Sequence, residues 1–197
     1  MNKYGVFLAR MQPLHKAHTF LVEQALSECE NVVIMLGSSN KKDMIRNPFT
    51  LEFRKEMLFD AMVELNSNID INRITIFELP DWSYENDEND TQRWGHYLYY
   101  NIVSRIQYKY FNIYYSDDSS IIKSWFDEEI AKFINLRLYD RTKILEGLSA
   151  TKIRQSIIDL NIEYLNQFMH KSTINKLDII RPYYLNVLSN PQSDFSM

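Results

Sequence analysis

Glycine is scarce in this chain: the 197 residues contain four, at Gly5, Gly37, Gly95 and Gly147. An average protein carries about 7% glycine. With glycines at these positions neither G-x-G-x-x-G nor a P-loop can be written, which excludes a phosphate cradle of either Gly-rich kind. Alanine and proline are also scarce, with six and five residues, whereas isoleucine is abundant with 21. An AT-rich genome accounts for this general bias.

Cysteine occurs only once, and long apolar runs and an excess of basic residues are missing. The single Cys29 cannot form an internal disulfide, so we expect a reduced, cytoplasmic compartment. No apolar run approaches 18 residues, and the short run at 4–9 is broken at once by Arg10, which predicts a soluble, untargeted protein with no membrane partner. The formal charge is −4 and no basic block is present, which argues against nucleic acid as a partner.

Apolar runs alternate with amphipathic stretches along the chain. Strand-like runs occupy 4–10, 31–36, 73–79, 113–115 and 134–139. Helical periodicity occupies 18–28, 50–65, 91–109, a segment beginning at 119 or 120, and 151–188 with a break near 171–172. The run NVVIML at 31–36 is nearly all apolar, as is typical of a strand buried on both faces of a parallel sheet.

This alternation predicts a doubly wound, Rossmann-like α/β fold. We expect a five-stranded parallel sheet with helices on both faces, built by residues 1–160. Residues 161–197 are then a C-terminal helical extension packed on the same domain. Polar clusters follow the predicted strands at 10–18, 37–46, 81–94 and 115–120, and ligands of such sheets bind beyond the carboxyl ends of the strands. The polar stretch 83–92 is long enough to form a lid.

The first of these clusters contains two histidines at a predicted strand-to-helix turn. His15 and His18 are three residues apart, so both imidazoles can face one point, where the start of a helix also favours an anion. With Arg10 and Lys16 beside them, they suggest a site for charge that develops on phosphate. The alternatives are a pair of solvated histidines or a metal pair. A metal site is the weaker of these two, because the segment offers no cysteine or carboxylate at ligand spacing.

A second cluster, LSATKIR at 148–154, opens a late helix. Ser149 can cap this helix, and Thr151, Lys152 and Arg154 crowd its first turn. Cations there oppose the helix dipole, which indicates that a bound anion supplies the missing negative charge. The alternative is a basic turn that arose by chance.

Together the two clusters resemble the H-x-G-H and I-S-x-T-x-x-R signatures of the nucleotidylyltransferase superfamily. The resemblance is closer to one branch, the archaeal-type nicotinamide-mononucleotide (NMN) adenylyltransferases and their bacterial relatives. Positions that match this branch's first and last motifs are Arg10, Gln12, Pro13, His15, His18, Ser149, Thr151, Ile153 and Arg154. Further matches are Leu36-Gly37-Ser38, IRNPFT at 45–50 followed by Arg54, Pro80-Asp81 with Trp94, and Tyr115-Ser116. The similarity spans about residues 4–160.

The resemblance implies transfer of AMP from ATP to NMN, giving NAD and pyrophosphate. The implied catalytic residues are His15, His18 and Arg154, with His18 at the α-phosphate. The resemblance assigns the ATP phosphates to Arg10, Gln12, Arg46, Ser149 and Thr151, and the NMN to Gly37, Ser38, Asp81, Trp82 and Trp94. Trp94 would stack on the nicotinamide ring; the alternative is a core aromatic. Mg²⁺ would enter with ATP rather than in a protein cage, and relatives of this kind are often homo-oligomers.

Several positions depart from the family pattern. Ala9, Ala17 and Ala150 replace family glycines, Asp117 follows Tyr115-Ser116 where glycine is usual, and Thr91 or Gln92 stands in place of an asparagine ahead of the tryptophan. The small alanines predict that the backbone there still lies close to a nucleotide. The departures leave three alternatives open: nicotinate mononucleotide as acceptor, another phosphorylated acceptor, or a catalytically weak nucleotide-binding sensor.

Overall fold

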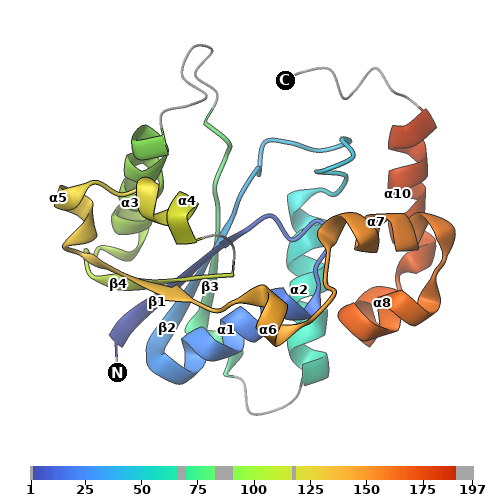
Figure 1. Ribbon diagram of the computed structural model, residues 1–197, viewed down its shortest axis with the longest axis horizontal. Helices are drawn as coiled ribbons and strands as arrows, with labels where there is room; N and C mark the ends of the chain where they lie inside the picture. Colours follow the sequence, from blue (N-terminus) through green and yellow to red (C-terminus); the bar gives the residue numbers. More distant parts are fainter. Residues whose placement is uncertain (1, 66–69, 83–90, 117–118, 190–197) are drawn as a thin grey trace.

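The computed structural model describes residues 2–65, 70–82, 91–116 and 119–189. At its centre is a five-stranded sheet in the order β3-β2-β1-β4-β5, in which every neighbouring pair is parallel (Figure 1). The strands are β1 Asn2–Ala9, β2 Cys29–Leu36, β3 Ile74–Glu78, β4 Phe111–Tyr115 and β5 Ile134–Leu138. The strand order and directions confirm the predicted doubly wound α/β fold.

Both faces of the sheet are buried under helices, as the apolar run of β2 predicts. Ile34 faces a core shared with α1 (Lys16–Glu28) and α2 (Leu51–Leu65), while its neighbours Val33 and Met35 face a core shared with α3 (Thr91–Ile106). The short helices α4 (Ser119–Ser124) and α5 (Glu128–Ala131) pack on the α3 side (Figure 1). The alternation of strand side chains therefore divides the interior into two cores, one on each side of the sheet.

Side-chain caps set several helix starts. The backbone N–H of Phe53 donates to Thr50 Oγ1 at 3.3 Å, so Thr50 caps α2 as predicted. Two short elements that the periodicity did not predict are the 3₁₀ turn η1 (Ile71–Arg73) and helix α6 (Arg141–Ile144). Residues 83–90 of the predicted lid lie outside the described residues, and its last two residues begin α3.

The C-terminal helical segment is interrupted three times, where one break was predicted. It consists of α7 Ala150–Asp159, α8 Ile162–Phe168, α9 Lys171–Ile174 and α10 Leu177–Ser189. The first break arises because Leu160 adopts a left-handed conformation (φ 56°) and Asn161 Oδ1 then accepts from the backbone N–H of Tyr164 at 3.2 Å, which starts α8. Apolar residues of α7, α8 and α10 share the core of α1 and α2. Among the described residues, no helix has the length and apolar character needed to cross a membrane.

Tyr184 of α10 gives a prediction about stability. Its side chain is fully buried, burial raises its pKa, and its hydroxyl has no hydrogen-bond partner among the described residues. Removing an unpaired buried hydroxyl recovers its desolvation cost, so Tyr184→Phe is expected to raise the free energy of unfolding by about 1 kcal/mol, measured by urea denaturation. Tyr114 is the matched control, because its equally buried hydroxyl donates to Glu28 Oε2 at 2.8 Å. Tyr114→Phe should lower the same free energy, and two changes of the same sign would contradict the prediction.

Candidate active site

A cavity of about 490 Å³ opens at the carboxyl ends of β1, β2 and β4. Strand order reverses between β1 and β4, and open α/β sheets place their ligands at such a switch point. The structure brings most of the predicted site residues together here. Those that line the cavity are Arg10, Gln12, His15, His18, Gly37, Ser38, Arg46, Asp81, Trp94 and Arg154.

The two histidines form a stacked pair at the start of α1. Their ring centroids are 3.6 Å apart and their planes differ by 14°. His15 is buried, and its backbone N–H donates to His18 Nδ1 at 3.2 Å. Because Nδ1 accepts this hydrogen bond, the neutral His18 ring carries its proton on Nε2, which can then donate to an anion.

Three arginines surround the same cavity from three separate segments. Arg10 follows β1, Arg46 lies in the loop before α2, and Arg154 lies on α7. Burial lowers the pKa of Arg154; Tyr184 opposes this shift, and the positive charges of Arg10 and Arg46 add to it. Converging cations of this kind favour an anion with several charges, and guanidinium groups suit phosphate oxygens.

Arg54 of α2 joins the two strand ends beneath the cavity. This residue is fully buried, and its Nη1 donates to the carbonyl oxygens of Arg10 at 3.1 Å and Gly37 at 2.8 Å. Its Nε and Nη2 have no hydrogen-bond partner among the described residues, and burial lowers its pKa, with Glu52 the largest opposing influence. Such a residue is costly to bury, so its two carbonyl contacts indicate that it fixes the ends of β1 and β2 in relation to each other.

The predicted phosphate residue Gln12 has a comparable positioning role. Its Oε1 accepts from the backbone N–H of Phe49 at 2.9 Å and its Nε2 donates to Asn47 Oδ1 at 3.3 Å. These contacts hold the loop that carries Arg46 against the turn after β1. The backbone of Met11 in that turn is left-handed (φ 53°), an uncommon conformation for a residue other than glycine.

Ser38 and Asp81 form a pair at the ends of β2 and β3. Ser38 Oγ donates to Asp81 Oδ1 at 2.9 Å, and Lys41 Nζ lies 2.9 Å from Asp81 Oδ2. Ser38 also has a left-handed backbone, with φ 51°. Strained residues tend to gather at ligand sites, and here both Met11 and Ser38 line the cavity.

The end of the cavity toward α3 is apolar and aromatic. Trp94 and Trp125 meet edge to face, with ring centroids 6.2 Å apart. Sequence reasoning missed Trp125, which directly follows α4 and carries no motif. Gly95 is the one signal that could have pointed to it: a Cβ at Gly95 would lie 1.7 Å from the Trp125 carbonyl oxygen, so glycine allows this loop to approach α3.

A family model described as cytidylyltransferase-like matches residues 6–156, more than half of the chain. The chain belongs to the cytidylyltransferase-like family. This membership confirms the resemblance seen in the sequence motifs and makes the protein a member of a nucleotidyltransferase family.

Named relatives of this cytidylyltransferase-like chain include archaeal enzymes. It is 28% identical over 159 residues to the nicotinamide-nucleotide adenylyltransferase of Thermococcus kodakarensis, covering 81% of this chain and 74% of that one. It is 30% identical over 155 residues to the enzyme of the same name from Thermococcus sibiricus, covering 79% and 73%.

A solved structure shows the same fold. The bifunctional NMN adenylyltransferase/ADP ribose pyrophosphatase of Francisella tularensis, described as complexed with AMP and a manganese ion, superposes with a TM-score of 0.70 at 24% identity. The alignment covers 98% of this chain and 54% of that protein, so the cytidylyltransferase-like chain spans about half of the bifunctional one.

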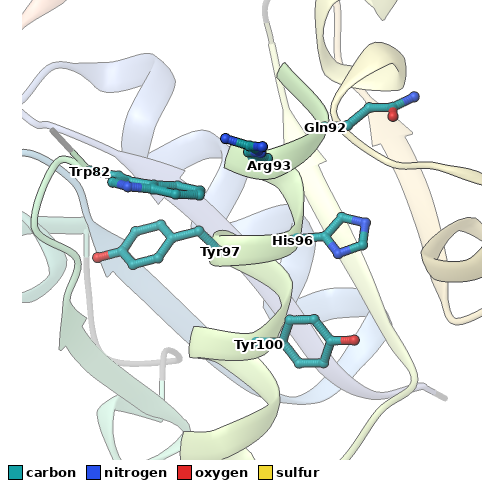
Figure 2. Close-up of a pocket in the computed structure, with 6 residues that line it drawn as sticks. All are labelled: Trp82, Gln92, Arg93, His96, Tyr97 and Tyr100. Atoms are coloured by element: carbon teal, nitrogen blue, oxygen red, sulfur yellow. The ribbon is translucent and has the colours of Figure 1, made fainter. Parts of the chain in front are cut away.

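Some predicted residues are not brought to the main cavity. Trp82 lies in a separate pocket of about 360 Å³ on α3, beside Arg93 and Tyr97 (Figure 2). This follows from its position one residue beyond Asp81, where the chain has left the sheet end and Trp82 packs 5.6 Å from the Tyr97 ring. His96 lines the same pocket, with its Nε2 2.6 Å from Asp127 Oδ2.

The start of α7 presents Ala150 and Arg154 to the cavity rather than the two predicted hydroxyls. Ser149 Oγ accepts from the backbone N–H of Lys152 at 3.4 Å and so caps the helix. Thr151 Oγ1 accepts from Arg154 Nη2 at 3.2 Å. In this cytidylyltransferase-like site both hydroxyls therefore support the helix start and its arginine.

The alanines that replace family glycines divide into two groups. Ala9 and Ala150 line the cavity, and their closeness to a nucleotide stays a prediction. Ala17 is buried in the core of α1 and α2 instead, so its methyl group is not directed at the cavity. Asp117 lies outside the described residues.

Proposed function

We propose that this protein transfers AMP from ATP to nicotinamide mononucleotide, giving NAD and pyrophosphate. The observation that carries the proposal is one cavity with two chemically different ends. Stacked His15 and His18 and three arginines line one end, and Trp94 and Trp125 line the other. A triphosphate suits the first end and a flat aromatic base suits the second.

At the cationic end the proposed roles follow from position. Arg10, Arg46 and Arg154 would bind the triphosphate from three sides, and His18 Nε2 would donate to the α-phosphate, where negative charge develops. His15 would hold the His18 ring in place by its stacked contact and backbone N–H. The phosphate oxygen of the mononucleotide is already a nucleophile, so catalysis needs orientation and charge stabilisation and no covalent enzyme intermediate.

At the aromatic end, Trp94 would stack on the base of the acceptor. Trp125 would close the pocket edge, and the Ser38–Asp81 pair beside Gly37 would contact the polar part of the mononucleotide. Thr91 Oγ1 donates to the carbonyl of Ser124 at 3.3 Å, so this residue joins α3 to α4.

Mg²⁺ belongs to the substrate in this proposal. Mg²⁺ is commonly held by substrate phosphates with only one or two protein carboxylates, so we place it on the triphosphate oxygens. Separately, the described ranges contain no group of three or more His, Cys, Asp or Glu side chains that could hold a metal ion. When bound, such an ion neutralises phosphate charge; the arginines and His18 orient the phosphates.

The test is turnover of the purified protein with ATP, Mg²⁺ and a mononucleotide acceptor, followed by release of pyrophosphate. We expect pyrophosphate and NAD in equal amounts with nicotinamide mononucleotide. Nicotinate mononucleotide and unrelated phosphorylated acceptors, assayed in parallel, define the specificity.

Two results would overturn the proposal. Pyrophosphate with another acceptor and none with nicotinamide mononucleotide would assign a different nucleotidylyltransferase activity. Binding of ATP without turnover on any acceptor would assign a nucleotide-binding sensor.

A further inference from the structure

The first turn of α1, which carries the histidine pair, is attached to the C-terminal helices on both sides of His18. On one side, Lys16 Nζ donates to the carbonyl oxygens of Asn166 at 2.9 Å and Gln167 at 3.0 Å, near the end of α8. The Lys16 ammonium thus satisfies carbonyl groups that the helix end leaves open. It does not line the cavity, although its place in the sequence between the two histidines suggests a phosphate contact.

On the other side, Thr19 contacts His170 in the interior. Thr19 Oγ1 lies 2.8 Å from His170 Nε2, and both side chains are almost fully buried, with 1% and 3% exposed. The Thr19 hydroxyl donates its proton to the carbonyl of Lys16 at 3.0 Å, so its oxygen accepts from His170 Nε2–H. This chain of hydrogen bonds ends on the backbone of the turn that presents His18.

His170 is itself held in place from α2. The Glu64 carboxylate accepts from the backbone N–H groups of Lys171 at 2.9 Å and Ser172 at 2.6 Å, the two residues that follow His170. Burial lowers the pKa of His170, Glu64 opposes this shift and Lys16 adds to it. The ring is therefore neutral near pH 7, with one proton to donate.

We propose that His170 is a positioning residue that acts through Thr19 to hold the His18 imidazole at its place over the cavity. The proposal rests on the proposed nucleotidyl transfer for its kinetic consequence and gives a role to a C-terminal segment that carries no sequence motif. A buried hydrogen-bonded pair fixes the position of a helix turn more narrowly than apolar packing alone. Even a small displacement of a catalytic group lowers the rate of reaction strongly.

The experiment compares Thr19→Val with Thr173→Val. The two threonines are equally buried, but the Thr173 hydroxyl has no hydrogen-bond partner among the described residues. Thr19→Val is expected to lower kcat about 10- to 100-fold with a smaller change in KM for ATP. Thr173→Val should leave both constants unchanged.

His170 variants provide the second arm. In His170→Gln the side-chain amide can still donate to Thr19, so kcat should be largely kept. His170→Leu removes this donor and should lower kcat as much as Thr19→Val does. Because the two residues act as one unit, the double variant Thr19→Val/His170→Leu should lower kcat by no more than either single change does.

A readout that does not depend on turnover is the NMR spectrum of the imidazole rings, since the chain has four histidines. Thr19→Val and His170→Leu should shift or broaden the His18 resonances, and Thr173→Val should not. Unaltered His18 resonances in folded Thr19→Val, or equal changes in Thr173→Val, would overturn the proposal. If the variants show the expected shifts but the wild-type protein makes no pyrophosphate, the result would instead contradict the proposed function alone.

Discussion

Replacing His18 with alanine is expected to lower turnover about 10²- to 10³-fold, the usual cost of removing one donor at a developing oxyanion. His18 lines the cavity, and its Nδ1 accepts the backbone N–H of His15, so Nε2 is the nitrogen that donates. A donor that acts mainly as charge develops contributes little to ground-state binding. The dissociation constant for ATP should therefore change less than about tenfold.

Pre-steady-state turnover and calorimetric binding of ATP measure the two effects separately. His96→Ala is the matched control and should retain wild-type turnover, because His96 lies in the separate pocket on α3, against Asp127. Loss of binding and of turnover by the same factor would contradict a transition-state role for His18.

The second large effect is expected on stability, from Gly95→Ala. Glycine inside a helix normally costs about 1 kcal/mol relative to alanine, so this change would stabilise an ordinary helix. Here the new methyl carbon would lie 1.7 Å from the carbonyl oxygen and 2.5 Å from the carbonyl carbon of Trp125. Because backbone atoms cannot move aside as a flexible side chain can, we expect a loss of about 2–3 kcal/mol in the free energy of unfolding.

Denaturant unfolding measures this loss of free energy of unfolding. Gly37→Ala is the control variant for stability. A Cβ at Gly37 would make ordinary contacts, at 3.6 Å from Leu8 Cδ1 and 3.8 Å from Arg10 Cγ. If Gly95→Ala still folds, Trp125 must move away from Trp94, so KM for the mononucleotide should rise more than KM for ATP. An unchanged or increased stability of Gly95→Ala would contradict the close approach of the two segments.

The local pattern of apolar and polar residues was enough to predict the sheet. The apolar run of β2 has to be buried on both faces, and side-chain alternation then separates residues such as Val33 and Ile34 into two cores. The cavity position followed from the same reasoning, because polar clusters after parallel strands meet at one sheet edge. Ten of the residues predicted for the site line one cavity.

Features that depend on tertiary contacts were not predictable in this way. The break after α7 requires Leu160 to adopt a left-handed conformation, which is uncommon for leucine and so could not be predicted from its residue type. Trp125 reaches the cavity because of a glycine thirty residues earlier in the chain, and Trp82 leaves it although Asp81 stays. For the two tryptophans the neighbour that decides the outcome is distant in sequence, whereas the break after α7 rests on local contacts of Leu160 and Asn161.

Arg54 connects the residues that follow β1 with those that follow β2, so the positions of these two parts of the site depend on each other. One buried guanidinium donates to the carbonyl oxygens of both Arg10, in the turn proposed to bind the triphosphate, and Gly37, in the loop proposed to contact the mononucleotide. A disturbance at Arg10 is therefore transmitted to Gly37, and the affinities for donor and acceptor nucleotide should rise and fall together. Engineering the protein toward a new acceptor thus has more freedom at the wall formed by Trp94 and Trp125 than at the strand ends, where a change in one subsite alters the other.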